Sequence, residues 1–342
     1  MIRQWIQTLF CAACVVSLIG CGSDADDSSP SSHSGNNGVN NSSTNSDPEP
    51  APPPRFSTDE FIYLSAENVI SVGSINDDVD PPQFSTRAVY THPTAIRSFI
   101  IAANRFGIYF TADDGGEYLT HAAYSVDAAG ENLSQIIDPL ESTQPSASLR
   151  VHTSSNQDEM RIWFGMHQSD YGASTISDTP FFVTDDGYQT PMFPCPLSGP
   201  VAPHPSSNQI AVVEGFCSGN TTDNYISLYD SPELDERTTL LAEGDNGIND
   251  LAFVRTLMWL DDTRLIVGLM SGTLVKIDIH QPHSPTVLHT GFPGYFTLSP
   301  DRTMIVAATN SDESLVMSPL SDLSQRWILT DTVRNRRPYW GE

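Results

Sequence analysis

A short apolar segment recurs along the chain, and its spacing constrains the fold more than any other feature. The copies are FIYLSA at 61–66, GIYFTA at 107–112, RIWFGM at 161–166, IAVVEG at 210–215, LIVGLM at 265–270 and MIVAAT at 304–309. Equivalent aliphatic positions, from Ile62 to Ile305, are 46, 54, 48, 55 and 40 residues apart. Apolar runs rich in β-branched and aromatic residues favour buried strands. A period of this size predicts repeated units of several strands each.

The segment Tyr295–Asn310 displays half of one unit. In YFTLSPDRTMIVAATN two apolar runs flank a Ser-Pro-Asp turn, which predicts an antiparallel hairpin. Pro300 presets a turn dihedral, and the Asp301 side chain can bond nearby backbone. Third strands are predicted at 122–130, 180–187, 225–232 and 274–280, and fourth strands at 131–139, 237–244, 285–291 and 325–332. With no extended helical pattern, the chain predicts an all-β domain of four-stranded units.

These repeats resemble the TolB-type β-propeller repeat, a WD-like module with a Ser-Pro-Asp-Gly turn between its first two strands. The best matches are FTLSPDRTMIVAAT and IYFTADDGGEYLTHAAYSVDAAGENLSQI. The resemblance implies a six-bladed propeller over 56–342. A seven-bladed ring with a degenerate unit in 66–106 is the alternative, and a pair of β-sandwiches is a further one.

The two ends of the predicted propeller are expected to share one blade. The first copy, 56–92, has no first strand of its own. The C-terminal segment RRPYW, at 336–340, looks like the strand that precedes a Ser-Pro-Asp turn. This segment is therefore expected to complete the first blade and to remove an exposed sheet edge.

Residues 1–20 predict a bacterial lipoprotein signal peptide. Arg3 precedes an apolar run at 5–19, which is too short to span a membrane comfortably. The run ends in LIGC at 18–21, which resembles a lipobox and implies lipidation of Cys21. An ordinary cleaved signal and an uncleaved anchor are the alternatives.

Residues 21–55 are expected to form the lipidated cysteine and an unstructured tether. The stretch is dominated by Ser, Asn, Asp and Pro, with Val39 as its only large aliphatic residue. Such a segment cannot bury enough apolar surface to offset the entropy of ordering it. Gly22, and not Asp, follows the cysteine. By resemblance to lipoprotein sorting, this implies the outer membrane of a Gram-negative bacterium, with the domain in the periplasm.

Two cysteines, Cys195 and Cys217, remain after Cys21. An even pair in an oxidising compartment predicts a disulfide. Two buried free thiols are the alternative.

The charge of the chain restricts its partners. It carries 42 acidic and 16 basic residues, for a net charge of −26. This balance opposes binding to nucleic acid or to anionic lipid through charge. Contact with the membrane is therefore expected through the lipid on Cys21. Arg334 and Arg336 belong to the only basic cluster and could form an anion site, with charge pairing inside an acidic domain as the other interpretation.

Catalytic signatures are missing from the sequence. There is no G-x-S-x-G, H-E-x-x-H, Walker A or G-x-G-x-x-G motif, so no cofactor or metal is predicted. His152 and His204 are the most enzyme-like residues, because they occur in VHTSSNQ and PHPSSNQ near the ends of two neighbouring first strands. They could begin a channel-mouth metal site or an acid–base pair, but they are also ordinary turn residues.

The sequence therefore favours a non-enzymatic function. Repeat folds usually present loops on one face for binding, and no convergent reactive set is visible. The expected function is a tethered binding or scaffold module for an envelope protein or small ligand. An enzyme of the lyase or hydrolase type, with its site in the propeller channel, is the alternative, because a fold does not determine a function.

Overall fold

The computed structural model divides the chain into two compact units, Met1–Ala51 and Pro52–Glu342. All described residues belong to the second unit. They are 53–76, 79, 81–113, 121–137, 148–155, 161–169, 176–184, 187–189, 197–215, 224–230, 236–309, 314–330 and 338–340. The predicted signal peptide, Cys21 and most of the tether lie outside these ranges and stay predictions.

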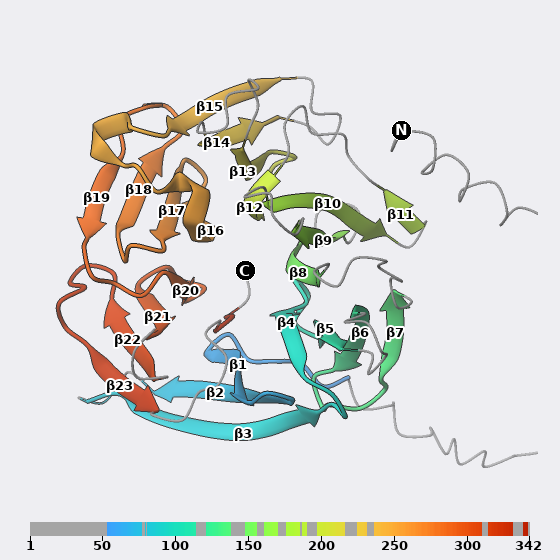
Figure 1. Ribbon diagram of the computed structural model, residues 1–342. Helices are drawn as coiled ribbons and strands as arrows, with labels where there is room; N and C mark the ends of the chain where they lie inside the picture. The colour runs from blue at the N-terminus through green and yellow to red at the C-terminus, as the bar shows by residue number, and fades with distance from the viewer. Residues whose placement is uncertain are drawn as a thin grey trace, which may run out of the picture. The chain divides into compact units, whose positions relative to one another are not determined.

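The described strands form five antiparallel sheets that follow one another around a common centre (Figure 1). The first contains β1 (Glu60–Ala66), β2 (Val69–Asn76) and β3 (Gln83–Thr91). The second contains β4 (Ile96–Ile101), β5 (Gly107–Asp113), β6 (His121–Asp127) and β7 (Ser134–Ile137). The largest contains β8 (Ser148–Ser155), β9 (Arg161–Ser169), β10 (Ile176–Thr184), β11 (Gly187–Gln189), β12 (Leu197–Pro203), β13 (Ile210–Gly215), β14 (Asn224–Tyr229) and β15 (Arg237–Ala242). The last two contain β16 (Val254–Asp261), β17 (Arg264–Leu269), β18 (Leu274–Asp278) and β19 (Thr286–His289), and β20 (Tyr295–Leu298), β21 (Met304–Ala308), β22 (Leu315–Pro319) and β23 (Trp327–Thr330).

The domain is an all-β propeller of four-stranded antiparallel blades, but it has five blades, so the predictions of six and of seven are wrong. The difference lies in the largest sheet, where two runs of four strands, β8–β11 and β12–β15, form one sheet. They join at a single position, where Asp178 of β10 pairs with Leu197 of β12. The sequence repeat predicts groups of strands, but it does not predict that two neighbouring groups pair with each other.

The six recurring apolar segments all form strands, as predicted. They form β1, β5, β9, β13, β17 and β21, with Met270 and Thr309 lying just past the ends of β17 and β21. In the four-stranded blades each is the second strand, so β21 pairs with β20 on one side and β22 on the other. Every residue of β13 is buried, which confirms the expectation of strands covered on both faces.

The hydrophobic core lies between neighbouring sheets. One cluster, for example, contains Ile226 of β14, Trp259 of β16 and Val275 of β18. The Trp259 side chain is fully buried and its indole N–H donates to the Ala202 carbonyl at 3.0 Å. Because each sheet packs against the next, apolar side chains on both faces of a blade are removed from water.

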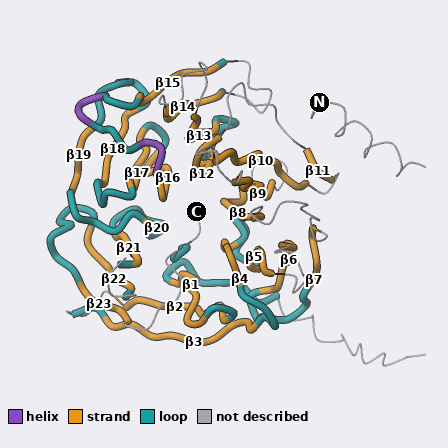
Figure 2. The backbone as a smooth tube through the Cα atoms, in the orientation of Figure 1, coloured by secondary structure: helices purple, strands orange, loops and turns teal. Residues whose placement is uncertain are grey.

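Where the connections between strands are described, they are turns and short loops (Figure 2). The described helices are single 3₁₀ turns, η2 (Asp245–Gly247) and η3 (Leu251–Phe253). Nowhere in the described ranges is there a helix of the length and apolarity needed to span a membrane.

The predicted Ser-Pro-Asp hairpin is confirmed between β20 and β21. Leu298 pairs with Ile305, and the Ser299 amide donates to the Met304 carbonyl at 2.9 Å. Asp301 Oδ1 accepts hydrogen bonds from the Ser299 hydroxyl and, at 3.1 Å, from the Thr303 amide. These bonds stabilise the ionised carboxylate, so they hold the pKa of Asp301 below its ordinary value.

The C-terminal residues contact the first sheet. The backbone N–H groups of Ile62 and Tyr339 donate to each other's carbonyl at 2.8 and 2.9 Å, which forms an antiparallel bridge. Trp340 packs against Phe61 with ring centroids 5.3 Å apart. Of the closing strand predicted at 336–340, the structure describes one β-bridge, at Tyr339. The rest of this strand stays a prediction.

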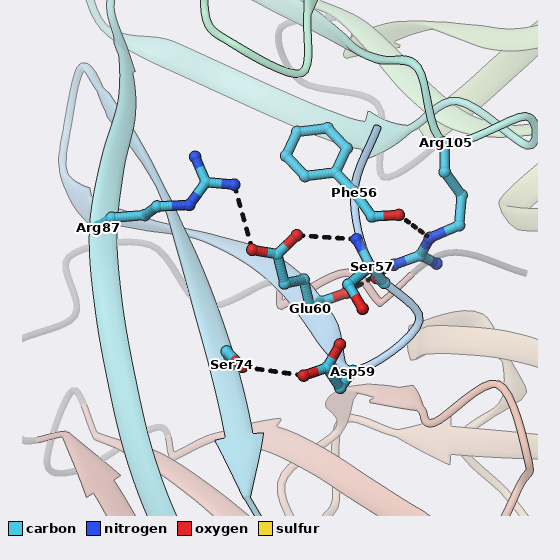
Figure 3. Close-up of polar contacts among 7 residues, drawn as sticks. All are labelled: Phe56, Ser57, Asp59, Glu60, Ser74, Arg87 and Arg105. Carbon is cyan, nitrogen blue, oxygen red and sulfur yellow. Dashed lines mark hydrogen bonds and ion pairs between the residues drawn. The ribbon is translucent and has the colours of Figure 1, made fainter. Parts of the chain in front are cut away.

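Arg105 binds residues at both the start and the end of the propeller, and Figure 3 shows its contact with Phe56 at the start. Its guanidinium donates to the carbonyls of Phe56 at 3.3 Å, Glu60 at 2.8 Å, Trp340 at 2.9 Å and also Ser57. The residue is only 4% exposed and has φ of 62°, in the left-handed region. The four carbonyl acceptors compensate the guanidinium for its loss of water. Their hydrogen bonds also offset the cost of the uncommon backbone conformation of Arg105.

Candidate functional site

Two faces of the propeller are defined by its strand ends. Equivalent ends lie on one face, because blades repeat one strand order around an axis. The start of a first strand lies opposite the end of a second strand, as Ile96 pairs with Ala112 and Val254 pairs with Leu269. We call the face with these ends the top face. The face with the turns between first and second strands is the bottom face.

An exposed apolar pair lies on the top face of the β16–β19 blade. Phe253 ends η3 just before β16, and Met270 follows the last residue of β17. The Met270 amide donates to the Phe253 carbonyl at 3.0 Å, so the two residues are direct neighbours. Each is 52% exposed. Adjacent, half-exposed side chains of this size are typical of an interaction surface when polar groups surround them.

Arg255 and Tyr295 extend this pair toward the next blade. The Arg255 guanidinium carbon lies 5.3 Å from the centre of the Tyr295 ring. Its Nη1 donates to the Tyr295 hydroxyl at 2.9 Å, and its Nη2 lies 3.0 Å from the Met270 sulfur. We call Phe253, Arg255, Met270 and Tyr295 the docking cluster. Aromatic residues, methionine and arginine are the types enriched in protein interfaces.

The loop that leads into the docking cluster is acidic. It carries Glu243, Asp245 and Asp250, and the Phe253 amide donates to the Asp250 carbonyl at 3.1 Å. Burial raises the pKa of the Glu243 carboxyl, and the neighbouring charge of Asp250 adds to this effect. Asp245 pairs with His283, whose Nδ1 lies 2.7 Å from its Oδ2. Asp250 therefore lies beside the docking cluster, and the chain that leads up to it carries two further acidic residues.

A second polar group lies on the top face of the β4–β7 blade. Asp113 and His121 pair across β5 and β6, and Asp113 Oδ1 lies 3.1 Å from His121 Nε2. The Arg97 guanidinium donates two hydrogen bonds to the same carboxylate, one of them from Nε at 2.6 Å. The His121 side chain is 7% exposed. A carboxylate that orients an imidazole is the arrangement of a general base, so this pair could take part in catalysis.

His204 lies on the bottom face, in the turn between β12 and β13. Its Nδ1 accepts from the Ser206 amide at 3.1 Å, and its Nε2 lies 3.0 Å from the Asp262 carbonyl oxygen. Its ring meets the Trp259 ring edge-on at 4.4 Å between centroids. These contacts join two neighbouring turns. The His152 side chain lies outside the described atoms, so a site shared by the two histidines stays a prediction.

The other predicted site residues, Cys21, Cys195, Cys217, Arg334 and Arg336, also lie outside the described ranges. Their lipidation, disulfide and anion-binding roles stay predictions. Within the described part of the chain, no three His, Cys, Asp or Glu side chains come together in a group able to hold a metal ion.

The sequence matches no known protein family and no curated protein. Solved structures do resemble the fold. A chain of a nidogen/laminin complex has a TM-score of 0.55 at 13% identity and covers 82% of this chain and 96% of its own length. A putative 6-phosphogluconolactonase from Bacteroides fragilis has a TM-score of 0.50 at 10% identity, covering 83% and 98%. An oligogalacturonate lyase from Vibrio parahaemolyticus has a TM-score of 0.48 at 12% identity, covering 73% and 72%.

The first two likenesses, with TM-scores of 0.55 and 0.50, support the fold alone and carry no activity to this chain, because the identities are only 13% and 10%. The docking cluster and the Asp113–His121 pair were both missed by sequence reasoning. Asp113 and His121 have a weak signal, since the sequence Asp-Asp-Gly-Gly at 113–116 predicts a turn between two strands. The docking cluster has none, because its members come from η3, β16, the end of β17 and β20.

Proposed function

We propose that this chain is a membrane-anchored binding module of the bacterial envelope. A lipid on Cys21 anchors it to the outer membrane, and residues 22–55 tether a TolB-like propeller on the periplasmic side. A flexible tether of this length reaches roughly 30 Å, from about 5–6 Å times the square root of its residue number. Tethering raises the effective concentration of the domain near partners held at the same membrane.

The observation that carries this proposal is the docking cluster. Phe253 and Met270 leave apolar surface in water, which costs free energy unless a partner covers it. Arg255 is held in place by Tyr295, so the surface is ordered before binding and less entropy is lost.

The charge distribution indicates the kind of partner. The chain has a net charge of −26, Asp250 lies next to Phe253 of the docking cluster, and Glu243 and Asp245 precede it in the same loop. A protein segment with an apolar side chain flanked by basic residues fits this surface best. Its apolar side chain would cover Phe253 and Met270, and its basic residues would face Asp250 and the acidic surface of the domain.

In-cell photocrosslinking tests this proposal. A photoreactive benzoylphenylalanine replaces Phe253 or Met270 in the full-length chain. Val287 and Ile328, which are 49% and 73% exposed on the outer strands β19 and β23, serve as matched positions. We expect one discrete protein adduct from positions 253 and 270 and none from 287 and 328. Equal labelling from all four positions would argue against a docking site.

The Asp113–His121 pair favours a second candidate function, an enzyme of the lyase or hydrolase type. In this account His121 takes a proton from a substrate bound at the top face, while Asp113 orients the ring and stabilises its charged form. His121→Asn removes the base but leaves the docking cluster intact. If this variant loses the cellular phenotype while the adduct from position 253 persists, the enzyme explains the phenotype and the binding module does not.

A further inference from the structure

A cavity of about 240 Å³ opens on the bottom face between the first sheet and the β20–β23 blade. This volume is below the roughly 300–1,000 Å³ of pockets that hold drug-sized ligands, so any occupant is small. The cavity lies where the C-terminal Trp340 meets both sheets. The Trp340 indole N–H donates to the Thr58 carbonyl at 2.8 Å, and its amide donates to the Thr297 hydroxyl at 2.9 Å.

Two carboxylates, one from each sheet, line the cavity. Asp59 precedes β1, and Asp301 lies in the turn between β20 and β21. The Ser74 hydroxyl donates to Asp59 at 3.1 Å (Figure 3). Hydrogen bonds hold the pKa of both carboxyls below the ordinary value, chiefly from Ser57 to Asp59 and from Ser299 to Asp301. Both groups are therefore ionised at neutral pH. Asp301 Oδ1 already accepts two hydrogen bonds, but its Oδ2 accepts one, from the Thr303 hydroxyl at 2.8 Å, and so keeps capacity for a further donor.

The rest of the cavity wall is neutral, and much of it is apolar. Ile75, Met304, Met317 and Trp340 provide the apolar part, with hydroxyls from neighbouring Thr and Ser residues. None of its described lining residues carries a positive charge. The cavity thus combines two fixed negative charges with an apolar wall, which suits a ligand with a cationic head and an aliphatic body. Tryptophan is also the best aromatic partner for organic cations.

We propose that this cavity binds the ammonium group of a short primary alkylamine, as a free molecule or as a lysine side chain of a protein. The ammonium group lies between Asp59 and Asp301, and the methylene chain covers the apolar wall. A neutral molecule of the same shape lacks the charge for the two carboxylates. An inorganic cation lacks the apolar body. This site is on the face opposite the docking cluster, so it is independent of the proposed binding function.

Titration of the full-length chain, followed by the ¹⁵N–¹H signal of the Trp340 indole, tests this site. The signal is assigned by its loss in Trp340→Phe. The probes are n-butylammonium, the peptide acetyl-Gly-Lys-Gly-amide, and n-butanol as the uncharged analogue. We expect a saturable shift with at least one of the two amines and at least tenfold weaker binding of butanol. The amine that binds more tightly identifies the source of the ligand.

Charge-removing variants complete the experiment. Asp59→Asn and Asp301→Asn each remove one carboxylate and keep an oxygen acceptor, and we expect each to weaken amine binding at least fivefold. Asp322→Asn is the matched control, because Asp322 accepts the same kind of turn hydrogen bonds from Ser324 outside the cavity. Asp59→Asn keeps the test decisive if the Asp301 variant does not fold. No saturable shift with either amine, or equal binding by wild type and Asp59→Asn, would overturn the proposal.

Discussion

The Arg105 guanidinium donates to the Trp340 carbonyl at 2.9 Å, although the two residues are 235 positions apart in the chain. Arg105 lies in the turn between β4 and β5, and it also binds three carbonyls at the start of the propeller. One side chain therefore holds the first residues of the domain, its last residues and the second sheet together. The sequence offered RRPYW as the feature that joins the two ends, and gave no sign that a buried arginine does so as well.

Replacing Arg105 should destabilise the whole domain. Arg105→Ala leaves four carbonyls without their donor, two in buried and two in part-buried hydrogen bonds, and each buried loss costs about 1–3 kcal/mol. We expect the free energy of unfolding to fall by at least about 3 kcal/mol. Comparison with Arg105→Gly separates the cost of the lost hydrogen bonds from the cost of the positive φ. Glycine also lacks the side chain, but it adopts a positive φ without strain.

Arg87 provides the control for this measurement. It pairs with Glu60 at 3.1 Å, and its side chain is 50% exposed. Exposed pairs contribute about 0–1 kcal/mol, so Arg87→Ala should change stability little. Similar losses for the Arg87 and Arg105 variants in urea-induced unfolding would contradict the structural role given to Arg105.

Burial of His92 should make the domain less stable in mild acid. Its ring packs against Phe110 and Tyr124, is 6% exposed, and burial lowers its pKa. The folded protein keeps this histidine neutral, while the unfolded chain takes up a proton as the pH falls below about 6.5. The unfolded state then binds more protons, so stability falls as the pH decreases from 7.5 to 5.

The contribution of His92 is measured by comparing the acid-induced loss of stability in wild type with that in His92→Phe. Burial raises the pKa of Glu243, so its effect on stability has the opposite sign. Melting temperatures at pH 7.5 and pH 5 should therefore be compared in both proteins. We expect a smaller loss in the variant. An equal loss in the two proteins would show that other groups control the pH dependence.

Strand positions could be read from this sequence better than sheet boundaries or sites. Apolar runs such as 210–215 define buried strands locally, and the structure confirms them. The number of blades depends on one pairing, between Asp178 and Leu197, which merges two groups of strands into one sheet. The two residues belong to different repeats, so the repeat pattern does not predict that they pair. The Asp113–His121 pair depends on register across a turn, and the docking cluster on packing between blades. Such contacts depend on tertiary structure, which periodicity does not encode.

The disulfide between Cys195 and Cys217 stays a prediction. The pairing of β12 with β13 is consistent with it, because residues near the two cysteines lie opposite each other. Leu197, two residues after Cys195, pairs with Glu214, three residues before Cys217. The closed loop would span about 22 residues and contribute about 3 kcal/mol in the chain-entropy model. Alkylation of denatured protein from the periplasm should modify neither cysteine until a reductant is added. Immediate modification of both would support the free thiols instead.

Lipidation of Cys21 can be tested by mass and by fractionation. We expect the mature protein to carry added acyl mass on Cys21 and to sediment with outer membranes. Cys21→Ser should remain unprocessed, because the thiol that accepts the lipid is missing. One acyl chain binds membranes only marginally, so firm association also requires more than one chain. Wild-type protein found soluble and without acyl mass would rule out the anchor.

Calorimetric titration of the propeller with the partner identified by the position-253 adduct tests the central claim most directly. The claim is that the chain functions by binding through the docking cluster. We predict that Phe253→Ser and Met270→Ser each weaken binding at least tenfold, which corresponds to about 1.4 kcal/mol. His121→Asn and Val287→Ser should leave the affinity unchanged, because these residues lie outside the cluster. Unchanged affinity in both Phe253→Ser and Met270→Ser would contradict the account.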